Sequence, residues 1–273
     1  PNRTLRSLYG GITGMTRALV TGAGHRLGQA MAVYLAQRGY DVAVHYASSE
    51  DGAQQTVRMI EEAGGNAVAL QADLLDDAAT SALFETAVEV LDGPIDCLVN
   101  NASIFEYDTV ETATRTSWDR HMQSNLRAPF ILTQAMADQG LVPKRDTADE
   151  PVASGLIVNM VDQRVRKLTP EFMTYTLAKM GLWALTQTTA RALAPAIRVN
   201  AIGPGPTLQG ARQSKEHFEN QRAATVLGRG ANPADIVAAL GYFLDAPAVT
   251  GQLICVDGGQ HLAWQTPDVQ GVE

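Results

Sequence analysis

The chain has 273 residues, 45% of them hydrophobic, so it can bury the core of one large α/β domain or of two small ones. Its 21 lysines and arginines are outnumbered by 29 aspartates and glutamates, giving a formal net charge of −8. This charge argues against a nucleic-acid-binding surface and against attraction to anionic membranes. We therefore expect a small diffusible substrate, with no nucleic-acid or membrane partner.

Cysteines and histidines give no sign of a disulfide framework or a metal site. Cys97 and Cys255 lie far apart, each inside an apolar run, and are expected to be buried free thiols. The five histidines have no ligand spacing with one another or with the cysteines, so we predict no metal.

The sequence also bears on location and on the limits of the folded part. It has no apolar stretch of about 18 residues, and its start lacks the long apolar core of a signal peptide, so a cytoplasmic protein is expected. We expect residues 1–14 to be a disordered extension, 15–264 to form one domain and 265–273 to be a C-terminal tail.

Short β-branched runs alternate with longer helical patterns from Thr16 onward, which is typical of βαβ units and a parallel sheet. The expected strands are 18–21, 42–46, 67–70, 97–100, 156–159, 197–200 and 253–256. The expected helices are 29–38, 51–63, 76–91, 117–138, 173–194 and 233–244. The sequence thus predicts an α/β fold with a single Rossmann-type, doubly wound parallel sheet of about seven strands flanked by helices.

Two polar segments interrupt this alternation. Residues 143–154 are expected to be a surface loop. Residues 207–222 follow the carboxyl end of a strand, where open α/β sheets bind ligands, so a mobile substrate lid is expected there.

A glycine-rich turn, Thr21-Gly-Ala-Gly-His-Arg-Leu-Gly28, joins the first strand to the first helix. Glycines at such a turn let backbone amides and the helix N-terminus approach a pyrophosphate. The same residues can also serve a simple tight turn, but the strand before and the helix after favour nucleotide binding.

The end of the second strand indicates which nucleotide is bound. His45-Tyr46 stands about where an acidic residue would bind a ribose 2′-hydroxyl in an NAD-selective site, and no acidic residue is there. Arg26 and His45, with the Ser48 and Ser49 hydroxyls, would suit a 2′-phosphate, so NADPH is favoured over NADH.

Asp73 follows the third strand and has two possible roles. It can accept a hydrogen bond from the adenine amino group, or it can cap the helix that follows.

Tyr175 and Lys179 are four residues apart in a helical pattern, so both side chains lie on one helix face. A tyrosine is a weak acid–base group at neutral pH, and a neighbouring ammonium favours its phenolate. Alone, such a pair is usually an ordinary exposed pair on a helix.

The order of these motifs resembles the short-chain dehydrogenase/reductase family over nearly all of residues 16–264. Asn100-Asn-Ala102, Asn125, Pro204-Gly205 and Val256-Asp-Gly-Gly259 add to the match. The resemblance implies that Tyr175 donates a proton, that Lys179 holds Tyr175 and the nicotinamide ribose, and that Asn125 orders a proton-relay water. It also implies homotetramers built through the long helices, 117–138 and 173–194. The implied cofactor contacts are Gly22, Arg26, Leu27, His45, Tyr46, Ser48, Ser49, Asp73, Leu74, Asn101, Ala102, Ser103, Tyr175, Lys179, Pro204 and Gly205.

One departure from the family concerns the substrate. Asp162 stands thirteen residues before Tyr175, where the family usually has a serine that polarises a carbonyl. A carboxylate would repel a developing alkoxide, so ordinary ketone reduction is not favoured. Asp162 can instead bind or protonate a nitrogen heterocycle; alternatively it is a solvated loop residue balanced by Arg164 and Arg166.

Arg26, Ser103, Phe105 and Asp162 together resemble pteridine reductases and bacterial dihydromonapterin reductases. The resemblance implies a pterin stacked between nicotinamide and the Phe105 ring, with the other three side chains and Tyr175 around its polar edge. Parasite pteridine reductases tend to have an arginine where Ser48 stands, which weakens the NADP inference. The alternatives are a carbonyl or sugar-alcohol oxidoreductase, and, in another class, a non-catalytic NADPH-binding sensor.

Overall fold

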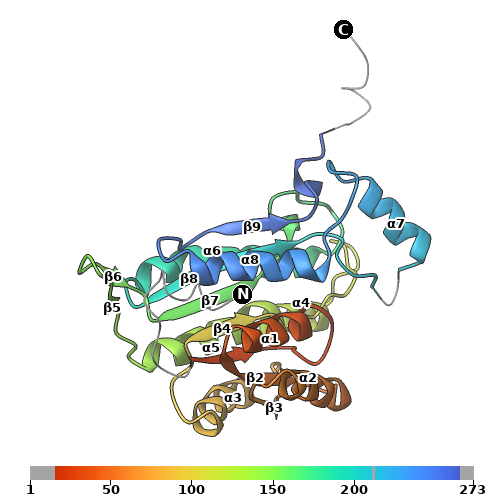
Figure 1. Ribbon diagram of the computed structural model, residues 1–273. Helices are drawn as coiled ribbons and strands as arrows, with labels where there is room; N and C mark the ends of the chain where they lie inside the picture. The colour runs from red at the N-terminus through yellow and green to blue at the C-terminus, as the bar shows by residue number, and fades with distance from the viewer. Residues whose placement is uncertain (1–15, 211–212, 265–273) are drawn as a thin grey trace.

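A parallel sheet of seven strands, in the order β3-β2-β1-β4-β7-β8-β9, forms the centre of the computed structural model, which describes residues 16–210 and 213–264 (Figure 1). The strands are β1 (Thr16–Val20), β2 (Tyr40–Tyr46), β3 (Ala67–Gln71), β4 (Cys97–Asn100), β7 (Gly155–Met160), β8 (Ile197–Pro204) and β9 (Leu253–Val256). All seven predicted strands are confirmed, although β8 continues four residues further than expected. The expectations for residues 1–14 and 265–273 lie outside the described residues.

The direction in which strands are added reverses between β1 and β4. The chain builds outward from β1 to β3 and then returns to place β4 on the other side of β1. Such a switch point leaves a crevice at the carboxyl ends of the two strands, where open α/β sheets bind their ligands.

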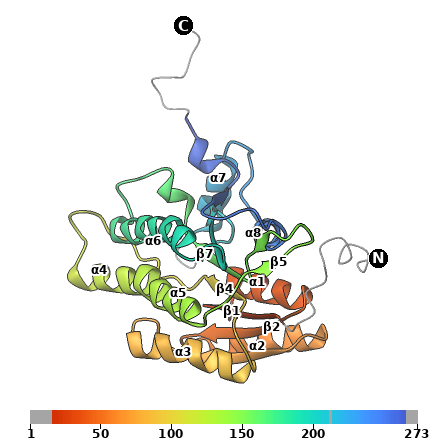
Figure 2. The ribbon, with the colours of Figure 1, turned by 90° about the vertical axis from the view of Figure 1, so that its left-hand side faces the viewer.

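Helices cover both faces of the sheet, which confirms the doubly wound prediction (Figure 2). One face carries α1 (Arg26–Gln37), α2 (Glu50–Glu62) and α8 (Pro233–Asp245); the other carries α3 (Asp77–Val90), α5 (Ala128–Asp138) and α6 (Met173–Ala192). The alternation of strand side chains explains this arrangement. In β1, Ala18 and Val20 belong to the core under α1, whereas Leu19 packs in the core under α3.

The predicted helix 117–138 is interrupted. It consists of α4 (Arg115–Met122), a π-helical segment η2 (Gln123–Arg127) and α5. Pro129 has no N–H for the Asn125 carbonyl four residues earlier, and in an α-helix its ring would clash with that carbonyl, so we attribute the wider segment to this proline.

Both polar segments contain some regular structure. Residues 143–154 hold a small antiparallel ribbon of β5 (Lys144–Arg145) and β6 (Pro151–Val152). The second segment holds α7 (Lys215–Ala223), which stands away from the sheet and has no buried residue (Figure 1). In residues 16–210 and 213–264, no helix is both long and apolar enough to cross a membrane.

Candidate active site

The glycine-rich turn leaves β1 at the switch point and lies against the residues that follow β4. The Asn101 side-chain amide donates to the carbonyls of Thr21 (2.9 Å) and Gly22 (3.1 Å), and the Thr21 hydroxyl accepts from the Asn101 backbone N–H at 2.9 Å. A Cβ on Gly28 would lie 2.2 Å from the Gly22 oxygen, so only glycine fits. The turn thus packs closely at the N-terminus of α1, the kind of place where backbone N–H groups bind a pyrophosphate.

The expectation for His45 needs correction. The ring is 1% exposed; Nδ1 accepts from the Gly22 N–H (3.0 Å), and Nε2 lies 3.1 Å from the Ala72 carbonyl, to which it donates. Burial lowers the pKa of His45 to about 4, so the ring is neutral and cannot attract a 2′-phosphate. His45 instead holds the glycine-rich turn against the end of β3.

The basic side chain that lies near Ser49 is that of His25. His25 is exposed and directly precedes α1; its ring lies so close to the N-terminal turn of α2 that a Cβ on Gly52 would be 2.1 Å from His25 Cε1. Ser48 is exposed and Ser49 is the N-cap residue of α2. His25 could not be singled out from the sequence, which pointed to Arg26 in the same turn and to His45 on β2; only the folded chain shows that the His25 ring reaches the start of α2.

The remaining adenosine-side predictions fall at the ends of β2 and β3. Tyr46 is half-buried. The Asp73 carboxylate is exposed and accepts from the Leu75 N–H at 3.0 Å, so it closes a turn, whereas Asp76 is the residue that caps α3. Leu74 is buried in the core beside α3. The adenine contact of Asp73 stays a prediction.

Tyr175, Lys179 and Asp162 meet at the carboxyl end of β7. Tyr175 Oη donates to Asp162 Oδ2 at 2.9 Å, and Asp162 Oδ1 accepts from the Arg164 N–H at 2.8 Å. Lys179 is 2% exposed, and its Nζ donates to the Met160 carbonyl at 2.7 Å. Because Asp162 is half-buried and bonded to Tyr175, it is not the solvated loop residue considered above.

Burial shifts the acidity of all three groups. It raises the pKa of Tyr175 well above 10, and the charge of Asp162 and the hydrogen bond to it add to this effect, whereas the Ser103 hydroxyl acts against it. Burial also raises the pKa of Asp162. It lowers the pKa of Lys179 to about 8, although Asp162 opposes this. The phenol is therefore protonated at neutral pH and is ready to act as an acid.

Asn125 is fully buried in the π segment, and its side chain holds one backbone unit. Its Oδ1 accepts from the Ile104 N–H at 3.1 Å, and its Nδ2 donates to the Ile104 carbonyl at 2.9 Å. The side chain therefore fixes the segment that carries Ser103 and Phe105. The proton-relay water stays a prediction.

Phe105 lies among aromatic side chains at the mouth of the site. It is 46% exposed; its ring stacks on Phe172 at 4.3 Å between centroids and meets the Tyr175 ring edge-on at 4.7 Å. The Arg164 guanidinium lies over the Phe172 ring, 4.7 Å from its centroid. Phe105 is thus not part of the core, and its ring lies against that of Tyr175.

Arg26 connects the glycine-rich turn to the segment that follows β8. Its two terminal nitrogens donate to the carbonyls of Leu208 (2.9 Å) and Gln209 (2.8 Å). Its φ is 55°, a left-handed conformation that costs free energy in a residue other than glycine. Arg26 therefore ties this segment to the nucleotide end of the cleft.

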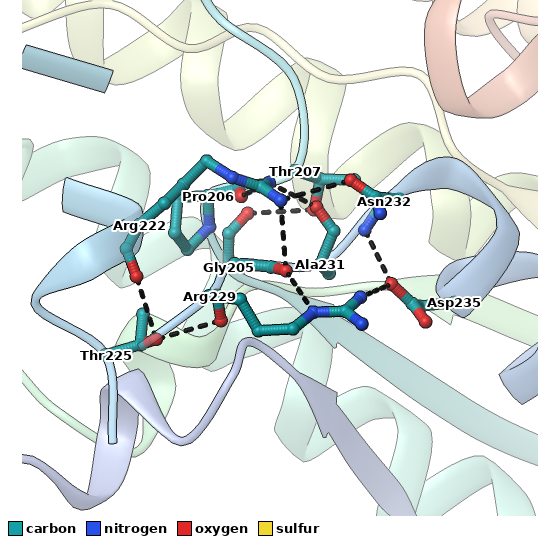
Figure 3. Close-up of polar contacts among 10 residues, drawn as sticks. Gly205, Pro206, Thr207, Arg222, Thr225, Arg229, Ala231, Asn232 and Asp235 are labelled. Carbon is teal, nitrogen blue, oxygen red and sulfur yellow. Dashed lines mark hydrogen bonds and ion pairs between the residues drawn. The ribbon is translucent and has the colours of Figure 1, made fainter. Parts of the chain in front are cut away.

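Arg222, on α7, holds the two ends of the same segment together (Figure 3). It donates to the Pro206 carbonyl at 2.8 Å on one side, and to the Gly230 carbonyl and Asn232 Oδ1 at 3.2 and 3.1 Å on the other. Gly205 directly precedes Pro206. It lies so close to Asp257 that a Cβ on Gly205 would be 2.5 Å from the Asp257 Cβ. Pro204 and Gly205 thus lie at the carboxyl end of β8, against the residues that follow β9.

The residues fit a nicotinamide cofactor. Gly22 and Gly28 let the turn pack closely against the residues after β4 at the start of α1, and within the described residues the one hydrogen bond of Lys179 uses one of its three N–H donors. The other two donors suit ribose hydroxyls. In residues 16–210 and 213–264, no group of three or more His, Cys, Asp or Glu side chains is arranged to hold a metal ion.

A sheet of this order, with a glycine-rich turn at its switch point and a buried Tyr–Lys pair beside it, defines a nicotinamide-dependent oxidoreductase with a Rossmann-type fold. A family model described as enoyl-(acyl carrier protein) reductase matches residues 22–261. The chain is 35% identical over 262 residues to 3β-hydroxysteroid dehydrogenase 1 of Eggerthella lenta, covering 93% of this chain and 97% of that protein. The chain belongs to the short-chain dehydrogenase/reductase family.

Other relatives differ in the activity that their names give. The 3-oxoacyl-[acyl-carrier-protein] reductase FabG of Staphylococcus aureus is 32% identical over 250 residues, covering 90% of this chain and 98% of FabG. The FolM alternative dihydrofolate reductase 1 of Brucella suis, solved with NADP, is 44% identical with a TM-score of 0.85, covering 93% of this chain and 98% of that one. A blue fluorescent protein from a metagenomic library, solved with NADPH, has a TM-score of 0.80 at 31% identity, covering 90% and 97%.

Proposed function

We propose that this protein uses NADPH to reduce a ring C=N bond of a dihydropterin or a related nitrogen heterocycle. The observation that carries the proposal is the hydrogen bond from Tyr175 Oη to Asp162 Oδ2, 2.9 Å long, at the position where a carbonyl reductase needs a neutral hydroxyl. A carboxylate there opposes an alkoxide but suits the N–H groups of a pterin.

The reaction is a balanced hydride and proton transfer. NADPH, when bound, supplies the hydride, which forms a C–H bond to the ring carbon while the π electron pair of C=N moves to the nitrogen. Tyr175 gives its phenolic proton to that nitrogen. The Lys179 ammonium stabilises the phenolate that remains, because it lies 5.7 Å from the Tyr175 ring centroid and is shielded from water.

Phe105, Ser103 and Asp162 are the side chains that we assign to the pterin. Phe105 offers an aromatic face beside Tyr175, and Asp162 lies within hydrogen-bond distance of the same phenol. Arg26 would complete the polar edge, through the segment that it holds or by direct contact. The activity for which the Brucella FolM proteins are named, alternative dihydrofolate reductase, supports this substrate class.

The preference for NADPH rests on the residues near the start of α2. His25, Ser48 and Ser49 would receive the 2′-phosphate, with His25 in the role first given to His45. The NADP or NADPH found in the solved relatives supports this assignment.

Stopped-flow oxidation of NADPH with dihydrobiopterin, dihydromonapterin and a panel of ketones tests the proposal. We expect single-turnover hydride transfer with at least one dihydropterin and kcat/KM values for the ketones at least about 100-fold lower. Turnover of ketones alone would overturn the pterin assignment, and binding of NADPH without any hydride transfer would support a sensor.

A carbonyl oxidoreductase is the second candidate, because the curated relatives are named as hydroxysteroid and 3-oxoacyl reductases. In that case Asp162 would be a tolerated replacement of the usual serine. Asp162→Ser should then raise ketone turnover and leave any pterin turnover unaffected.

We also propose a homotetramer that uses the faces of α4, α5 and α6. Trp118, Phe130 and Leu177 are apolar side chains exposed on these three helices. Light scattering coupled to gel filtration tests this, and a monomer at micromolar concentration would contradict it.

A further inference from the structure

The segment from Ser103 to Asp108 has no regular secondary structure, yet its side chains alternate. Ser103, Phe105 and Tyr107 are exposed, whereas Ile104 and Glu106 are half-buried and Asp108 is buried. In an extended chain successive residues point to opposite sides. The segment therefore has one exposed row of side chains and is held by the other row.

Each residue of the inner row is bound by a helix. Ile104 is held by Asn125, and the Glu106 N–H donates to His121 Nε2 at 3.1 Å. The Asp108 carboxylate accepts from the Thr174 N–H at 3.1 Å. Phe105 stands between the first two of these attachments, so they set the place of its ring.

His121 is fully buried. The tautomer of its ring follows from the hydrogen bonds that Thr174 makes. Asp108 Oδ2 can only accept, so the Thr174 hydroxyl donates to it. The Thr174 oxygen then accepts from His121 Nδ1, 2.7 Å away. The ring proton is therefore on Nδ1, and Nε2 keeps the lone pair that receives the Glu106 N–H.

We propose that His121 is a positioning residue that fixes the place of the Phe105 ring relative to the Tyr175 hydroxyl. It accepts a hydrogen bond from the Glu106 N–H, and it is hydrogen-bonded to the Thr174 hydroxyl at the start of α6. Thr174 directly precedes Tyr175, and the His121 and Tyr175 rings are 6.1 Å apart between centroids. The hydrogen bonds of His121 with Glu106 and Thr174 thus connect the residue next to Phe105 with the residue next to Tyr175. The inference rests on the proposed function only in that a flat substrate ring is taken to stack on Phe105.

In this arrangement the hydrogen bond from the Glu106 N–H to His121 depends on the protonation state of His121. A proton on Nε2 would face the Glu106 N–H with a second donor and break that bond. The Asp108 and Glu106 carboxylates favour the imidazolium, while burial and the Arg120 guanidinium disfavour it and lower the pKa of His121. The His121 ring is then neutral at neutral pH, and its protonation at lower pH breaks the bond that holds the segment carrying Phe105.

The first test needs no substrate. Long-range ¹H–¹⁵N spectra of the protein should show His121 with a protonated Nδ1 and a bare Nε2, and the Glu106 amide should exchange slowly with solvent. His121→Phe and Thr174→Val should each speed this exchange at least about tenfold, as expected for loss of one buried hydrogen bond. Thr174→Ser, which keeps the hydroxyl, should not. A protonated Nε2, or equal Glu106 exchange in all variants, would overturn the inference.

The second test uses kinetics with dihydrobiopterin. His121→Phe should raise the KM for the pterin about tenfold while the KM for NADPH and kcat change less than about twofold. Because the pKa of His121 is lowered from 6.5, the wild-type pterin KM should rise as the pH falls below 6.5, and His121→Gln, whose amide oxygen can accept but not titrate, should remove that rise. Equal increases of both KM values, or the same acid limb in His121→Gln, would overturn it. A wild-type protein that fails to turn over pterins contradicts the proposed function, but leaves the first test to decide on His121.

Discussion

Tyr175 donates a hydrogen bond from its phenol to the carboxylate of Asp162 across 2.9 Å; the tyrosine is buried and the aspartate half-buried. A serine in place of Asp162 would leave the phenol beside a neutral group. With Asp162, the phenolic proton lies between two oxygens whose pKa values are both raised by burial. In the proposed reaction Tyr175 would keep this proton until a basic ring nitrogen accepts it.

Burial raises the pKa of the Tyr175 phenol, and the charge of Asp162 adds to this effect because it disfavours the phenolate. Asp162→Asn removes that charge and should lower the pKa of Tyr175. Titration of tyrosinate absorbance near 295 nm, as a difference against Tyr175→Phe in each background, measures the shift. An unchanged Tyr175 pKa in Asp162→Asn would show that the two groups are not coupled.

Loss of the Lys179 ammonium should limit the enzyme at alkaline pH. Burial lowers the pKa of Lys179 to about 8, so the charge that stabilises the phenolate disappears as the pH rises through that value. We expect kcat/KM for reduction to fall above about pH 8. Lys179→Arg, which stays charged, should move this limb upward even if its rate is lower; an unmoved limb would assign the titration to another group.

His45 should make the fold sensitive to acid. Its folded pKa of about 4 lies below the ordinary 6.5, so the unfolded chain binds the proton first and the stability that the neutral ring supplies is lost as the pH falls from 6.5 toward 4. The loss amounts to up to about 3 kcal/mol of unfolding free energy. Urea unfolding at several pH values should show a shallower acid slope in His45→Gln. The control is His25→Gln, which alters an exposed ring and should keep the wild-type slope.

Arg222 should be important for stability because it binds three backbone carbonyls and Asn232 at both ends of one segment. Arg222→Ala leaves these acceptors without their donor and should lower the free energy of unfolding by about 2–4 kcal/mol. Arg58→Ala, on the exposed face of α2, should change it by less than about 0.5 kcal/mol. Equal effects in urea unfolding would contradict the role that Figure 3 gives to Arg222.

Sequence analysis could predict the sheet because its strands are apolar on both faces, and it could predict Tyr175 and Lys179 because their spacing places them on one helix face. The role of His45 was misjudged, since a strand pattern does not tell whether a residue near the end of the strand is buried or exposed. The break at η2 was in principle readable from Pro129, four residues after Asn125. The contacts of Arg26 with Leu208 and Gln209 join residues more than 180 positions apart and needed the folded chain.

The most direct test of the account is the ratio of kcat/KM for a dihydropterin to kcat/KM for a ketone, measured in the wild type and in Asp162→Ser. If Asp162 directs Tyr175 toward a ring nitrogen, the substitution should lower the pterin value by about 100-fold or more and raise the ketone value. The ratio should then fall mainly because kcat/KM for the dihydropterin falls. An unchanged pterin value with improved ketone turnover would contradict the account and make the protein a carbonyl reductase.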